Sequence, residues 1–232
     1  LFPQQGDGFV VVRELATGRE LREPAGALPP PPRPTPDEPP SGPPHGIRLA
    51  FTPDGRFLLA ITFPSKPEVD AAKKARKKAA EMPRTGLLIL DTSSGAVQRV
   101  TNVKNMQVPE EGPALVAFLK EPPAAPEAKP GETKPPYGSD LVLRILDGRA
   151  GERTFAGVTE YALASDGRTL LYAVSSRNAE ENGVYAVETA ADTQPAALLR
   201  SKGKYSKLAW DRGRRRAAFL ATRGDASAPH LY

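Results

Sequence analysis

The sequence contains no cysteine, only two histidines and a single tryptophan in 232 residues. Without cysteine, the chain can form neither disulfides nor thiolate metal sites. It also has no run of about 20 apolar residues, so no membrane-spanning helix is predicted. Aromatic residues are only 6% of the chain, whereas Pro and Gly number 26 and 20, which indicates many turns and loops. Apolar residues at 39% are still enough for a packed core.

Residues for hydrolytic or metal chemistry are equally scarce. His45 lies between Pro44 and Gly46, and His230 is two residues from the last position. A serine hydrolase needs a nucleophile on a strained turn, typically G-x-S-x-G, with a positioned His and carboxylate. The sequence has no such motif, and its Ser-Ser-Gly at 93–95 and Ser-Lys-Gly at 201–203 fall inside expected hairpins. We therefore predict no catalytic residue, no metal site and no cofactor site in this chain.

The net charge of +5 invites comparison with nucleic-acid-binding proteins. Much of the excess lies in two clusters, Lys73, Lys74, Arg76, Lys77 and Lys78, and Arg212, Arg214, Arg215 and Arg216. Neither cluster contains the interleaved aromatic or groove-reading residues that binding to nucleic acid requires. Charge runs of this kind usually mark solvent-exposed segments, so no nucleic-acid partner is predicted.

One hairpin pattern recurs along the chain: an apolar pair, a polar turn with Gly, and an apolar run. Asp-Gly between apolar runs is a strong hairpin signal, because Gly adopts positive φ without steric cost. The two clear copies turn at Asp54-Gly55 and Asp166-Gly167, and the two weaker ones at Gly112 and Gly213. A second hairpin alternates with it, in copies that begin at Val10, Leu87, Leu141 and Gly183.

Two hairpins per unit give four strands, which is one blade of a β-propeller. The fold class predicted is therefore all-β, a β-propeller segment of about four blades with Pro-rich loops and one short helical insertion. The blade repeats are placed around 8–28, 47–101, 106–157, 160–199 and 205–232, with insertions at 29–44, 64–84 and 121–138. The helix is expected near residues 70–82, where Ala, Lys and Arg predominate.

The apolar runs at 57–61 and 170–174 are nearly continuous. Strands covered on both faces by neighbouring blades show this pattern. A β-sandwich of short strands is the alternative, but it does not predict the same pair of hairpins four times.

Within this fold, the remaining polar candidates are interpreted mainly as structural. Asp54 and Asp166 are expected to form turns, and Trp210 is expected to pack in the core because it matches Phe51 in the repeat. Adjacent carboxylates occur at 110–111 and 180–181. Neighbouring strand residues point to opposite faces, so neither pair is a joint metal ligand. They are interpreted as polar turn residues, and the alternative is that one of them faces the propeller channel and meets a substrate amine.

The turns at 51–56 and 164–168 resemble the S-P-D-G-[KR] blades of Tol-type periplasmic propellers and of the N-terminal propellers of prolyl oligopeptidase-family (S9) serine peptidases. Two stretches are more similar to bacterial members of the peptidase family. One is Tyr205–Asp211 with the following Ala217–Leu220. The other is Thr62–Asp70, which leads into a Lys-rich helix and a Leu-Asp-Thr-x-x-Gly hairpin.

The peptidase resemblance implies a substrate-gating propeller, which admits peptides to an α/β-hydrolase domain that carries the triad. No catalytic residue of that family can be placed on this sequence. The expected partners are the hydrolase domain or further blades, on the same or another chain, and a peptide substrate. The other function class is a non-catalytic exported scaffold that binds a protein partner. An exported location, periplasmic or secreted, is expected. Residues 1–6 lack the features of a signal peptide, and the sequence also lacks an initiator Met, so we expect the chain to begin downstream of a removed segment.

Overall fold

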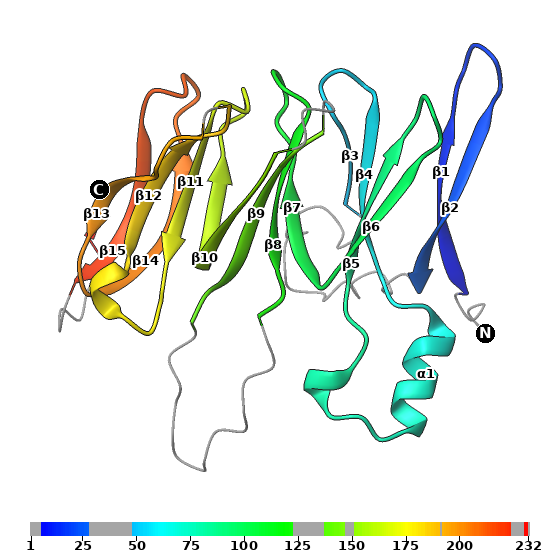
Figure 1. Cartoon of the computed structure of the whole chain (residues 1–232), viewed down its shortest axis with the longest axis horizontal. Helices are drawn as coiled ribbons and strands as arrows, with labels where there is room; N and C mark the ends of the chain where they lie inside the picture. The colour runs from blue at the N-terminus through cyan, green and yellow to red at the C-terminus, as the bar shows by residue number, and fades with distance from the viewer. Residues whose placement is uncertain are drawn as a thin grey trace, which may run out of the picture. The chain divides into compact units, whose positions relative to one another are not determined.

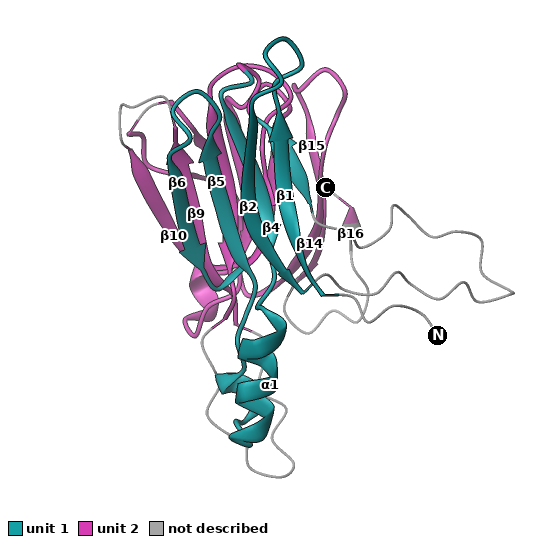
Figure 2. Cartoon of the chain, turned by 90° about the vertical axis from the view of Figure 1, so that its right-hand side faces the viewer, with its two compact units in different colours: residues 1–51, 55–103 teal, residues 52–54, 104–232 magenta. Residues whose placement is uncertain are grey.

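The computed structural model describes residues 6–27, 48–122, 137–146, 151–190, 192–223 and 230–231. These residues form two compact units (Figure 2). The first comprises residues 1–51 and 55–103, and the second comprises residues 52–54 and 104–232. Strands dominate both units. His45 and the Pro-rich insertion at 29–44 lie outside the described residues.

The first unit contains a hairpin and a four-stranded antiparallel sheet (Figure 1). The hairpin pairs β1 (Asp7–Arg13) with β2 (Glu20–Ala27). The sheet has the order β3 (Leu49–Phe51), β4 (Phe57–Thr62), β5 (Gly86–Asp91) and β6 (Val97–Thr101). Between β4 and β5 the chain forms helix α1 (Lys66–Lys74) and the short 3-10 helix η1 (Ala79–Glu81).

The second unit contains two antiparallel sheets. The larger has the order β7 (Val103–Gln107), β8 (Leu115–Lys120), β9 (Ser139–Ile145), β10 (Glu152–Leu163), β11 (Thr169–Val174), β12 (Gly183–Glu188) and β13 (Ala196–Arg200). The smaller has the order β14 (Gly203–Trp210), β15 (Ala217–Arg223) and β16 (His230–Leu231). The 3-10 helix η2 (Ala179–Glu181) joins β11 to β12.

Strand β10 divides the larger sheet into two overlapping meanders. It pairs with β9 at Glu152–Phe155 and again at Val158, and with β11 from Val158 to Leu163. The register with β9 shifts between Phe155 and Val158, where Gly157 has a φ of +70°. A four-stranded antiparallel meander is the unit of a β-propeller. The predicted all-β propeller class is therefore confirmed, while the number of blades and their boundaries stay predictions.

The meander β10–β13 buries apolar side chains on both of its faces. Tyr172 packs in a cluster with Leu143 and Leu170, whereas the next residue, Ala173, packs in a different cluster with Tyr205 and Phe219. Successive strand residues point to opposite faces, so two neighbouring residues in two cores require a cover on each side. A sheet of a β-sandwich buries one face, which makes the sandwich alternative wrong for this region.

The hairpin turns follow the predicted positions. Gly55, Gly112 and Gly167 have φ values of 69°, 90° and 69°, as the Gly-containing pattern requires. The last turn differs, because the left-handed residue is Arg214, at φ 59°, and not Gly213. Asp211 stabilises this turn by accepting hydrogen bonds from the backbone N–H groups of residues 215 and 216, both at 2.7 Å.

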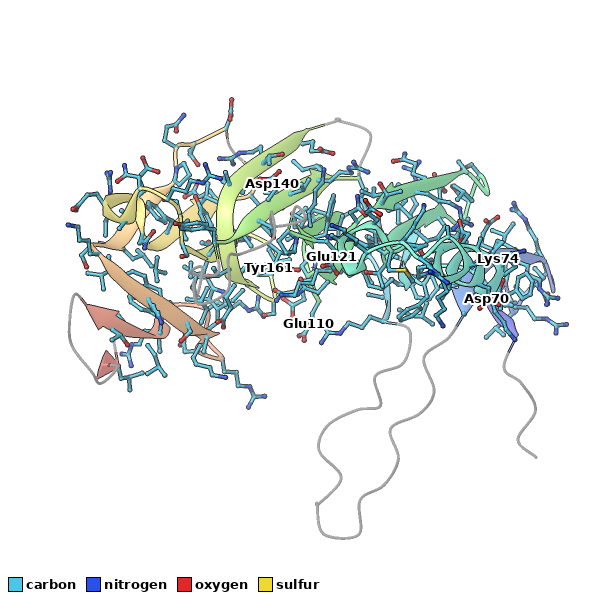
Figure 3. All side chains as sticks on the ribbon, turned by 90° about the horizontal axis from the view of Figure 1, so that it is seen from below. Asp70, Lys74, Glu110, Glu121, Asp140 and Tyr161 are labelled. Atoms are coloured by element: carbon cyan, nitrogen blue, oxygen red, sulfur yellow. The ribbon has the colours of Figure 1, made fainter. Side chains whose placement is uncertain are left out.

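Helix α1 exists as predicted but begins earlier and is shorter. Ser65 caps it: its hydroxyl accepts from the N–H of Glu68 at 3.3 Å, and its own N–H donates to the Glu68 carboxylate at 2.8 Å. This capping box sets the start at Lys66. Asp70 and Lys74 are exposed on the helix (Figure 3), as are the other basic residues of the first cluster. No helix within the described ranges is both long and apolar enough to cross a membrane.

The turn after β5 is held by the carboxylate of Asp91, a side chain that is only 12% exposed. It accepts hydrogen bonds from the Ser93 hydroxyl at 2.6 Å, from the Ser94 N–H at 3.2 Å and from the Arg56 guanidinium at 3.0 Å. These bonds, led by the one from the Ser93 hydroxyl, hold the pKa of Asp91 well below its usual range. The serines of this turn therefore support the hairpin.

We expect Asp91→Asn to reduce the free energy of unfolding by about 1–3 kcal/mol at pH 7, because charge-assisted hydrogen bonds are lost. A carboxyl with a lowered folded pKa stabilises the protein above its unfolded pKa of about 3.9. That contribution disappears as the pH falls from there towards the folded value. Urea unfolding at pH 7, 5 and 3 should show the difference between wild type and Asp91→Asn shrinking at the lowest pH. Asp192→Asn, at a fully exposed carboxylate, serves as the control, and a constant difference would contradict the prediction.

Candidate functional site

The structure brings few of the sequence-predicted polar residues together into a reactive arrangement. His230 starts the two-residue strand β16. Within the described ranges, no group of three or more His, Cys, Asp or Glu residues could hold a metal ion. Ser201 shares a 2.8 Å hydrogen bond with the Tyr205 hydroxyl, as a residue of the β13–β14 connection.

Three turns of the second unit contact one another: those that connect β7 to β8, β10 to β11 and β14 to β15. The N–H groups of Glu110 and Glu111 both donate to the carbonyl of Ser165, at 2.8 and 2.9 Å. Arg214 donates to the Glu111 carboxylate at 3.0 Å and lies 3.8 Å from that of Asp166. Both predicted carboxylates at 110–111 thus lie in a turn, and Arg214, unlike the exposed arginines around it, links this turn to its neighbours.

Side-chain hydrogen bonds also join the first strands of these hairpins, β7, β10 and β14. Gln107 donates to the carbonyl of Tyr161 at 3.2 Å and accepts from the N–H of Leu163 at 2.7 Å. The Glu160 carboxylate accepts from two successive N–H groups of β14, at 207 and 208, both at 2.9 Å. These bonds join β10 to β7, another strand of the larger sheet, and to β14 of the smaller sheet.

Trp210 takes part in the same linkage. Its indole N–H donates to the carbonyl of Ala162 at 3.1 Å, and the side chain is half-buried. The residue that it matches in the repeat, Phe51, is 53% exposed. The predicted core role of Trp210 is therefore wrong: Trp210 is an interstrand contact, and Phe51, the residue that it matches, is a surface residue.

A pocket of about 330 Å³, called here the aromatic pocket, opens at one end of the β10–β13 meander. Its lining comprises Phe155, Ala156, Tyr172, Val174, Glu181, Tyr185 and Arg200. Tyr172 and Tyr185 are direct partners across β11 and β12, and their rings stack with centroids 5.6 Å apart. The Phe155 ring lies 4.9 Å from that of Tyr172, so the three rings form a continuous wall.

Polar groups at the rim of the aromatic pocket are held in place by local hydrogen bonds. The Tyr185 hydroxyl donates to the carbonyl of Glu181 at 2.7 Å. Arg200 donates through Nε to the carbonyl of Glu180 at 2.9 Å, and the Glu181 carboxylate accepts from Asn178 at 3.0 Å. The adjacent carboxylates at 180–181 thus lie in η2, where Glu181 reaches the pocket.

Burial raises the pKa of Tyr172, and the neighbouring Tyr185 adds to this effect. Burial also raises the pKa of Tyr185, while the charge of Arg200 opposes the rise. Both hydroxyls therefore stay protonated at neutral pH; that of Tyr185 donates to the carbonyl of Glu181, whereas that of Tyr172 can donate to a ligand. No sequence pattern pointed to these tyrosines as a site, although four of the six tyrosines fall between residues 161 and 205.

No protein-family model matches the chain, and a search of curated proteins gives no match. Among solved structures, the chain is similar to Pyrococcus horikoshii acylaminoacyl peptidase, at 9% identity and a TM-score of 0.44, with 97% of this chain and 33% of the peptidase covered.

It is also similar to a prolyl endopeptidase at 14% identity and a TM-score of 0.43, and to TolB from Acinetobacter baumannii at 12% and 0.42. These matches cover 100% and 98% of this chain and 29% and 50% of the other. The chain thus spans about a third of the length of the peptidases. At such identities and TM-scores, the matches do not establish a family for it.

Proposed function

We propose that this chain is the substrate-gating propeller portion of a prolyl oligopeptidase-type serine peptidase. In this proposal an α/β-hydrolase domain outside residues 1–232 hydrolyses peptides, and the propeller limits which peptides reach it. The sequence motifs that resemble those of the peptidases support the proposal, because they occupy the tight turns of the hairpins.

The linkage of first strands is the observation that carries the proposal. A gate excludes large substrates only if the strands around it resist separation. Gln107, Glu160 and Trp210 each join two of these strands through hydrogen bonds from a side chain to a backbone. Such bonds are short-range and directional, so they restrain the spacing between the strands that they join.

The isolated chain is expected to be catalytically inert. General-base catalysis alone contributes about 10²–10⁴-fold, and it requires a base positioned beside a nucleophile. Incubation with chromogenic dipeptide and acyl-amino-acid substrates should give no turnover, and a fluorophosphonate probe should label no serine. Replacing both His45 and His230 by Ala should change nothing. A labelled serine mapped within residues 1–232 would contradict the proposal.

The longer polypeptide provides the complementary test. A G-x-S-x-G elbow in the sequence after residue 232 would support the peptidase, and turnover by that polypeptide should respond to substrate length. The absence of this elbow would favour a non-catalytic scaffold. An exported location is part of the proposal, and detection of the protein in periplasmic or secreted fractions would test it.

A further inference from the structure

The aromatic pocket has features of a ligand site that the gating role does not use. Its volume of about 330 Å³ lies at the small end of the range of ligand pockets. It therefore suits one side chain with its backbone groups better than an extended chain. Phe155, Tyr172 and Tyr185 supply an apolar wall on which a flat ring can stack.

One polar group of the wall is the hydroxyl of Tyr172. The side chain of Tyr172 belongs to a residue that is only 4% exposed, and its ring lines the pocket. Among the described residues, none forms a hydrogen bond with its hydroxyl. The hydroxyl oxygen itself is not fully buried, so a molecule in the pocket can reach it and supply its hydrogen bond.

The charges around the pocket favour an anion. Arg200 lines it, and the guanidinium of Arg153 lies 5.3 Å above the ring of Phe155. Glu181 is the only carboxylate among the lining residues. Arg200 uses Nε to bind the carbonyl of Glu180, which fixes the plane of the guanidinium and leaves its Nη groups for a ligand. A guanidinium in this state can bind a carboxylate through two parallel hydrogen bonds.

Glu181 adds a further requirement on the ligand. Its carboxylate is oriented by Asn178 and can accept a hydrogen bond from an N–H group of a ligand. The ligand should therefore combine an aromatic ring, a carboxylate and an N–H donor within a few bonds of one another. The C-terminal residue of a peptide that ends in Phe or Tyr has this combination on a single Cα atom.

We propose that the aromatic pocket binds the C-terminal aromatic residue of a peptide, with its ring against Phe155, Tyr172 and Tyr185 and its carboxylate on Arg200. The site is separate from the proposed gating role and requires no hydrolase domain. Its failure would leave that role untouched, because the experiment measures binding alone.

The test is an NMR titration of the chain with Ala-Ser-Phe, Ala-Ser-Phe-amide and Ala-Ser-Ala. The free acid should bind at millimolar peptide and shift the amide resonances of the lining residues. The amide should bind about tenfold to a hundredfold more weakly, because hydrogen bonds to a charged partner are lost. Ala-Ser-Ala should bind more weakly still, since it offers no ring to the wall.

Arg200→Gln should lower the affinity for the acid by the same factor and abolish the preference for acid over amide, as a double-mutant cycle requires. Arg200→Lys should recover part of the preference, because it keeps the positive charge but not the two parallel hydrogen bonds of a guanidinium. Arg177→Gln is the matched control: it removes an equal charge from an exposed residue near η2 that does not line the pocket, and it should leave binding unchanged.

Three results would overturn the proposal. The first is no binding of the acid up to about 10 mM, a concentration that corresponds to a binding free energy of about −3 kcal/mol. The second is equal binding of acid and amide to the wild type. The third is an Arg200→Gln variant, folded by circular dichroism, that keeps the full preference for the acid.

Discussion

Replacing Gly26 by Ala is expected to destabilise the first unit by more than about 3 kcal/mol. Gly26 has a φ of +80°, and a Cβ atom there would lie 1.8 Å from the carbonyl oxygen of Phe63 and 2.5 Å from the carbonyl carbon. Both are backbone atoms that cannot rotate away. The contact is fixed by hydrogen bonds from Phe63 N–H to the carbonyl of Ala25 and from Ala27 N–H to that of Pro64, at 2.8 and 3.0 Å.

Gly18 offers a matched control for this substitution. It has a φ of +73° and no atom within 4 Å of an added Cβ. Gly18→Ala should therefore cost only the left-handed conformation, about 1–2 kcal/mol. Urea unfolding of both variants separates the steric from the conformational contribution to the loss of unfolding free energy. Hydrogen exchange of Gly26→Ala should show a loss of protection in β1 and β2. Equal destabilisation by the two substitutions would contradict the predicted clash.

Leu170→Ala is expected to reduce the free energy of unfolding by about 2–5 kcal/mol. Leu170 is fully buried and packs in the cluster of the second unit that also contains Leu115, Leu141 and Tyr172. The substitution leaves a cavity under a sheet that is covered on both faces, so the surroundings can collapse only in part.

Leu198 in strand β13 of the same sheet is the control, because its side chain is 49% exposed. Leu198→Ala should change the unfolding free energy by no more than about 0.5 kcal/mol. Both variants can be compared by urea unfolding monitored through the fluorescence of Trp210. Similar losses would mean that the two faces of the meander are not both packed as described.

The sequence allowed the hairpins to be predicted because their signals are local. Asp54-Gly55 and Asp166-Gly167 specify turns by themselves, whatever the rest of the chain does. The start of α1 could also have been found, since Ser65 and Glu68 have the spacing of a capping box. The helix was predicted at residues 70–82 because that segment is rich in Lys. In the structure the helix ends at Lys74, and Arg76, at φ 51°, lies beyond its end.

The aromatic pocket could not be predicted in the same way. Phe155, Tyr172 and Tyr185 lie on three strands, and strand register and the bulge in β10 bring them together. Register depends on how each turn closes and on which face is covered, which a single sequence does not fix. The continuity of β10 was missed for a related reason: the boundary between two repeats falls inside one strand.

That shared strand has a consequence for how the second unit comes apart. In a chain of separate hairpin pairs, each could open by itself, and hydrogen exchange would report a series of small, independent events. Here β10 provides hydrogen bonds to β9 with one end and to β11 with the other. Because the two meanders share β10, opening one of them also strains the hydrogen bonds of the other. We therefore expect the two to open as a single cooperative unit. A force applied along β10 would act through the bulge at Gly157, and we expect the strand to give way there first.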